Sequence, residues 1–117
     1  MGTNYFKGLT VRQKAMDFVI WVYNLSMNLP RHEQFGIAGQ LQRAAVSIAS
    51  NIAEGSRRRG RKEFSNFCGF ARGSAAEAET QLLIIQRIYP KTNTSPGLTE
   101  VTEIQKMLTV LIRALTS

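Results

Sequence analysis

Residues Gln40 to Glu63 read QLQRAAVSIASNIAEGSRRRGRKE, and this stretch decides the fold. Small and apolar residues recur at helical spacing in its first part, and at Gly55 this pattern stops and a basic run begins. The stretch therefore predicts a closely packed helix over residues 37–54, with Gly55 as its C′ residue, next to a cluster of positive charge.

Three further helices are predicted from the same kind of spacing, over residues 10–29, 61–89 and 98–116. Thr10 and Gln13 form a capping box at the first of these starts, so residues 1–9 are expected to be a loosely held lead-in. Phe35 lies in the polar turn that follows Pro30 and is expected to tuck inward. The start of the last helix is left open between Ser95-Pro96 and Thr99-Glu100.

Each predicted helix carries an apolar stripe that is expected to face a common core. The stripes contain Val11, Ala15, Phe18, Val22, Leu25 and Leu29; Ile37, Leu41, Ala44, Ala45, Ile48 and Ile52; Phe64, Phe67, Ala71, Ala75, Ala78, Leu82, Ile85 and Tyr89; and Val101, Ile104, Leu108, Leu111 and Leu115. No segment alternates as a β-strand does, and the connections are short. The expected fold is all-α, an antiparallel up-down-up-down four-helix bundle that forms one domain over residues 1–117.

A second apolar stripe runs along the first helix, beside the one that faces the core. It contains Met16, Val19, Ile20, Tyr23 and Met27. A four-helix bundle has no central helix that would bury both stripes internally. The second stripe is therefore expected to form an interface with another copy of the chain.

Composition narrows the class of partner. The net charge is +7, with 15 Lys and Arg against 8 Asp and Glu, and ten of the basic residues are arginine, which suits bidentate phosphate contacts. This balance favours a nucleic acid or an acidic protein surface as partner. No apolar run of about 18 residues is present, so no membrane contact is expected. The single cysteine and the mixed first ten residues predict a cytoplasmic protein.

Catalytic and metal sites find little support. His32 and Cys68 are the only histidine and cysteine, so a di-metal helix site and a Cys–His nucleophile both lack their residues. An all-oxygen metal site formed by carboxylates remains an alternative, and its candidate residues are Glu54, Glu63, Glu77 and Glu79. The expectation is a protein that is not an enzyme and that uses no cofactor and no metal.

Several polar residues lie within the second and third helices: Arg43, Ser47, Asn51, Glu54, Arg72, Ser74 and Glu77. If these side chains are buried they must pair, because an unpaired buried polar group costs about 1–3 kcal/mol. The expected pairs join Arg43 or Arg72 to Glu54 or Glu77. We assign the set to a structural network that fixes helix register or docking, rather than to chemistry.

The basic run is the strongest functional signal, and it consists of Arg57, Arg58, Arg59, Arg61 and Lys62. Cations this close together repel one another, so the run gains from a polyanion whose counterions are released on binding. No aromatic residue lies within it for base stacking, so binding without sequence specificity is expected.

Two stretches carry a resemblance to a known family. Residues 44–55, followed by the arginines and by Lys62-Glu63-Phe64, resemble the 23S rRNA-intervening sequence proteins, and residues 71–82 resemble the second hallmark of that family. The resemblance implies a homopentameric ring of bundles. A related branch contains the accessory variability determinant of diversity-generating retroelements, which implies RNA or DNA and a reverse transcriptase as partners.

These observations favour an oligomeric protein that binds RNA or DNA through phosphates. The first alternative is a protein-docking adaptor, in which the basic run meets an acidic protein. The second alternative is an enzyme, which would need a cleft that gathers Glu54 and Glu77 around a cation.

Overall fold

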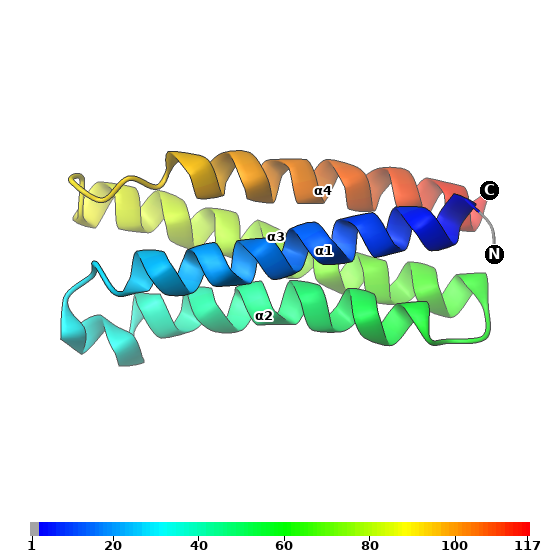
Figure 1. Ribbon diagram of the computed structural model, residues 1–117, viewed down its shortest axis with the longest axis horizontal. Coiled ribbons are helices and arrows are strands. Elements are labelled where there is room, and N and C mark those ends of the chain that lie inside the picture. Colours follow the sequence, from blue (N-terminus) through cyan, green and yellow to red (C-terminus); the bar gives the residue numbers. More distant parts are fainter. Residues whose placement is uncertain (1–2) are drawn as a thin grey trace.

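The computed structural model describes residues 3–117, which form four long helices and no strand. The elements are α1 (Thr3–Ser26), a short 3₁₀ helix η1 (Arg31–Phe35), α2 (Ile37–Ser56), α3 (Arg61–Ile88) and α4 (Ser95–Thr116). Figure 1 shows the helices side by side along one long axis, with successive connections at alternate ends, so that α1 begins at the end where α4 finishes. The all-α prediction with four helices is confirmed.

The predicted inward stripes form the core of the described chain. All of their residues are buried except Ile37, Phe64, Phe67 and Tyr89, which are partly buried. Ala71, Ala75 and Ala78 of α3 are fully buried. Because these side chains are small, neighbouring helices pack closely along the middle of α3.

The predicted start of the first helix at Thr10 is wrong. The helix α1 begins at Thr3, and the Thr10 hydroxyl donates to the carbonyl oxygen of Phe6 at 2.9 Å, inside the helix. The hydroxyl therefore bonds back to the preceding turn and caps nothing. At its other end α1 stops at Ser26, three residues before the predicted end.

Gly55 is not a C′ residue, because α2 continues through it to Ser56. No glycine among residues 3–117 has a positive φ. A Cβ on Gly55 would lie 2.6 Å from the Cβ of Phe67 and 3.0 Å from Cδ1 of Phe64, and one on Gly8 of α1 would lie 2.9 Å from Cζ of Phe64. The two glycines let α1 and α2 approach the Phe64 ring from two sides.

The end of the bundle that contains η1 and the α3–α4 connection also differs from the prediction. Phe35 is 91% exposed, so the prediction that it tucks inward is wrong. A hydrogen bond connects η1 to the residue that follows α3, since the Tyr89 hydroxyl donates to Oε2 of Glu33 at 2.6 Å. The helix α3 ends at Ile88, one residue early, and α4 begins at Ser95 with Pro96 in its first turn, which settles the open start.

Candidate nucleic-acid interface

The basic run occupies the connection between α2 and α3 and the first turn of α3, and we call residues 57–62 the basic turn. All five of its cationic side chains are exposed. Arg58 lies 3.5 Å from Oε1 of Glu54, and its guanidinium is 5.0 Å from the centre of the Phe67 ring. Arg61 donates to the carbonyl oxygen of Ala114 at the end of α4, where a cation is favourable.

The other three cations of the basic turn have no such contact. Within residues 3–117, no ion pair or side-chain hydrogen bond involves Arg57, Arg59 or Lys62. Glu54 is the one acidic side chain that pairs with the basic turn in this part of the chain, and it is itself half exposed. The basic turn therefore keeps most of its positive charge unneutralised.

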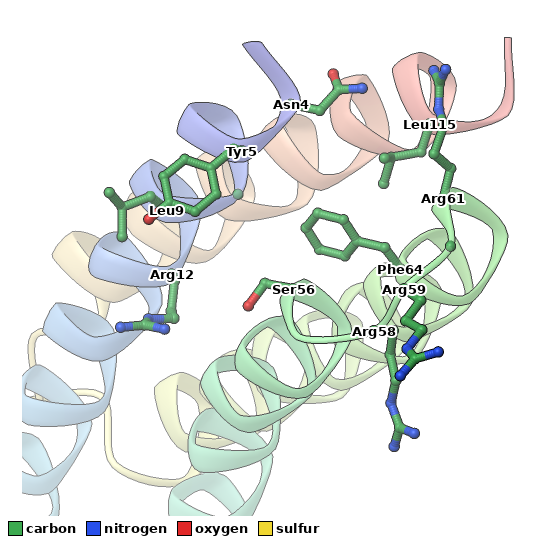
Figure 2. A pocket seen from close by; sticks show the side chains of 12 residues that line it. Asn4, Tyr5, Leu9, Arg12, Ser56, Arg58, Arg59, Arg61, Phe64 and Leu115 are labelled. Carbon is green, nitrogen blue, oxygen red and sulfur yellow. The ribbon is translucent and has the colours of Figure 1, made fainter. Parts of the chain in front are cut away.

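A cavity of about 620 Å³, which we call the end pocket, adjoins the basic turn. It is lined by Asn4, Tyr5, Gly8, Leu9, Arg12, Ser56, Arg58, Arg59, Gly60, Arg61, Phe64 and Leu115. Figure 2 shows Tyr5 on α1 and Phe64 reaching from α3 toward α1, while Arg61 stands beside Leu115. Four arginines and no acidic residue line this pocket.

Sequence reasoning missed the end pocket, because its residues come from three separate regions of the chain. Tyr5 lies in the segment that was predicted to be a loose lead-in. Arg12 is remote in sequence from the basic turn, and Phe64 was assigned only to the core stripe. No local spacing in the sequence shows that these side chains meet.

The predicted polar network is formed only in part. The hydroxyls of Ser47 and Ser74 lie 2.8 Å apart across the contact between α2 and α3. Nδ2 of Asn51 donates to the carbonyl oxygen of Ser47 at 2.9 Å and to its hydroxyl at 3.1 Å. All three side chains are partly buried, so these bonds link the two helices where they pack together.

The predicted ion pairs of this network are wrong. Arg43, Glu54, Arg72 and Glu77 are all exposed, and none of the expected pairs is found among residues 3–117. Arg72 donates to the Thr109 hydroxyl at 3.3 Å instead, and Glu54 pairs with Arg58. Because these four side chains lie in solvent, they need no buried partner.

The second apolar stripe of α1 is exposed in the single chain. Met16 is 51%, Ile20 63% and Tyr23 44% exposed, and Met27, one residue beyond the end of α1, is 81% exposed, whereas Val19 is partly buried against the core. Large apolar side chains gathered on one face are typical of an interaction site.

The residues that could bind a metal ion do not cluster within residues 3–117. No group of three or more His, Cys, Asp or Glu able to hold a metal ion occurs in the described part of the chain. Cys68 is buried, and this burial raises the pKa of its thiol to about 11. Of the helices within residues 3–117, none has the length and apolar content needed to cross a membrane.

Comparisons with known proteins agree with this fold. The model of the 23S rRNA-intervening sequence protein family matches residues 7–110. A crystal structure of a protein with unknown function from the S23 ribosomal protein family of Bacteroides thetaiotaomicron is similar to this chain, with a TM-score of 0.83 and 28% sequence identity. The similarity covers 92% of this chain and 98% of that chain. No curated protein matches. Because the family model spans most of its length, the chain belongs to the 23S rRNA-intervening sequence protein family.

Proposed function

We propose that this protein is a cytoplasmic, non-enzymatic protein that binds RNA or DNA through phosphates, with the basic turn as its contact surface. The observation that carries the proposal is the group of exposed cations at one end of the molecule, of which Arg57, Arg59 and Lys62 have no partner within residues 3–117. Phosphates bound there would release counterions and relieve the repulsion between neighbouring arginines. The family name, which refers to an intervening sequence in 23S rRNA, supports RNA as one ligand.

The direct test is a salt titration of binding to labelled RNA and DNA. Each phosphate contact contributes a slope of about −0.9 to a plot of log K against log salt for duplex DNA, and about −0.7 for a single strand. The variant with Arg57→Glu, Arg59→Glu and Lys62→Glu should bind weakly and with a shallower slope. The control matched in net charge combines Arg31→Glu, Arg87→Glu and Lys91→Glu, three exposed cations at the opposite end of the bundle. Equal binding by the two variants would overturn the proposal, and so would a wild-type protein that binds no nucleic acid at about 50 mM salt.

We also propose that copies of the chain, each an antiparallel up-down-up-down bundle, assemble as a homopentamer through the exposed stripe of α1. The exposure of Met16, Ile20, Tyr23 and Met27 supports self-association, and the number five comes from the family resemblance. Ile20→Glu should dissociate the assembly in light scattering. The control is Val110→Glu, which changes an apolar residue on α4 that is 51% exposed. A wild-type monomer at micromolar concentration would refute self-association.

Exposed Phe70 favours a second candidate function, docking to an acidic protein such as a reverse transcriptase. The Phe70 side chain is 61% exposed on α3, and its ring packs edge-to-face against the Phe67 ring. The guanidinium of Arg58 lies over that Phe67 ring. An apolar side chain next to cations suits a protein surface better than bare phosphate. Phe70→Ala should weaken capture of a purified reverse transcriptase and leave RNA binding unchanged. Capture that Phe70→Ala does not alter would exclude this candidate.

A further inference from the structure

We propose that the end pocket takes one unpaired nucleobase of a bound strand, while the arginines at its rim hold the adjoining phosphates. This inference rests on the proposed nucleic-acid binding. It adds that the strand must be single-stranded where it meets the pocket.

The first argument is the chemistry of the pocket walls. Leu9, Phe64 and Leu115 supply apolar surface, and Arg12, Arg58, Arg59 and Arg61 supply charge of one sign. A ligand that fits both must be apolar over one part and anionic over another. A nucleotide has this character, because its base is flat and its phosphate is charged. The volume of about 620 Å³ lies in the range of roughly 300–1,000 Å³ that is usual for small-ligand sites.

The second argument is the pair of aromatic rings. Tyr5 is 46% exposed near the start of α1, and Phe64 enters the pocket from the first turn of α3 (Figure 2). The Phe64 ring is fixed between Gly8 and Gly55, where even a methyl group would overlap with it. A ring held in this way loses little entropy when a base stacks on it, and every base offers a face for stacking.

The third argument is the start of α3 at the pocket mouth. Gly60 takes the N-cap position, has no side chain, and lines the pocket with Arg61. No side chain therefore caps the first backbone N–H groups of α3, and such groups favour phosphate. These N–H groups lie in the same turn of α3 as Phe64, which forms the aromatic wall of the pocket together with Tyr5. A base and its own phosphate would thus be held at the same time.

A double helix cannot use the end pocket in this way. Its bases are paired and stacked, so a duplex offers the protein mainly phosphates. We therefore expect a blunt duplex to contact the basic turn alone, and a single strand to contact both the basic turn and the pocket. The two forms of nucleic acid should respond differently to a change in the pocket wall.

The test compares Tyr5→Ala with Phe35→Ala, since Phe35 is a 91% exposed aromatic residue that does not line the pocket, whereas the ring of the neighbouring Phe6 contacts Tyr5. Binding is measured at one salt concentration with a single-stranded RNA that carries 2-aminopurine and with the blunt duplex of the same sequence. Tyr5→Ala should weaken single-strand binding about tenfold and abolish the quenching of 2-aminopurine fluorescence that stacking causes. Duplex binding should stay unchanged, and Phe35→Ala should alter neither single-strand nor duplex binding.

Three outcomes would overturn the inference. If wild-type protein binds both forms without quenching, phosphate binding stands and the base pocket fails. If Tyr5→Ala weakens both forms equally, or neither, the pocket makes no distinction between strands and the inference also fails. If wild-type protein binds neither form, the proposed function falls as well. Helical content measured by circular dichroism, equal in both variants, shows that the comparison concerns folded protein.

Discussion

Replacement of Gly55 by alanine tests whether the contact between α2 and α3 requires a residue without a side chain. Gly55 is buried inside α2. At an unhindered helical position, alanine in place of glycine would raise the free energy of unfolding by about 0.5–1 kcal/mol. The opposite is expected here, because the added Cβ would lie 2.6 Å from the Cβ of Phe67 and 3.0 Å from Cδ1 of Phe64.

The magnitude follows from which atoms collide. The Cβ of Phe67 is fixed to the backbone of α3 and cannot rotate away, so the two helices must move apart. Overpacking of this kind costs about 1–3 kcal/mol, and the gain in helix propensity offsets less than 1 kcal/mol of it. The net loss should be about 1–2 kcal/mol, which is a decrease in Tm of several degrees in a chain of this size. Thermal and urea unfolding followed by circular dichroism, at one protein concentration, measure both quantities.

Gly73→Ala is the matched control, because a Cβ at this exposed position of α3 would meet nothing within 4 Å. It should raise the free energy of unfolding by about 0.5–1 kcal/mol. Gly69→Ala, whose Cβ also meets nothing within 4 Å, should behave in the same way. If Gly55→Ala stabilises the protein as these controls do, the close approach of α2 and α3 is refuted.

Three further predictions concern single contacts. The hydrogen bond from Tyr89 lowers the pKa of Glu33 below its ordinary value of 4.5. This contact therefore stabilises the fold above pH 4.5, and its contribution is lost as the pH falls through the lower pKa of the folded state. Tyr89→Phe should remove this pH dependence and flatten the acid limb of a plot of Tm against pH. Ser74→Ala removes the bond to Ser47 and should cost about 1 kcal/mol in urea unfolding, and an unchanged midpoint would mean that the bond contributes nothing. Cys68, whose burial raises the pKa of its thiol to about 11, should react with a thiol reagent at neutral pH only after unfolding, and rapid labelling of the native protein would contradict its burial.

The core was predictable because helical spacing alone determines it. Ile48 and Leu108 lie on apolar stripes of helices whose opposite face is mostly polar, and burial of such a stripe is the main source of helix stability in a folded protein. The apolar stripes can be recognised in the sequence even where the helix ends are predicted wrongly. The errors in helix assignment therefore fall at helix boundaries and not in the core.

The boundary errors have a common physical cause. Thr10 and Gln13 match a capping box, and Gly55 before a basic run matches a helix end, yet both positions lie inside helices. Tertiary contacts outweigh these local preferences, since Gly8 and Gly55 pack against the Phe64 ring. A glycine that is needed for close packing looks the same in the sequence as a glycine that ends a helix.

The candidate site shows the same division between local and distant contacts. The basic turn is contiguous in the sequence, so its position between α2 and α3 was predictable from composition and helix breaks. The end pocket is lined by Tyr5, Arg12 and Phe64, which come together because α1 extends to Thr3 and the Phe64 side chain reaches from α3 to Gly8 of α1. The aromatic wall that a base would need is thus a property of the tertiary structure.

The separation of the two surfaces decides how assembly and binding should combine. The exposed stripe runs from Met16 to Met27, toward the end of α1 that is remote from the basic turn (Figure 1). Copies joined along this stripe would keep their basic turns free, and a long strand that touches several of them would bind with avidity greater than one turn provides. A strand too short to reach a second turn would gain nothing. Ile20→Glu should therefore weaken binding to a long nucleic acid and spare binding to a short one, whereas charge reversal in the basic turn should weaken both.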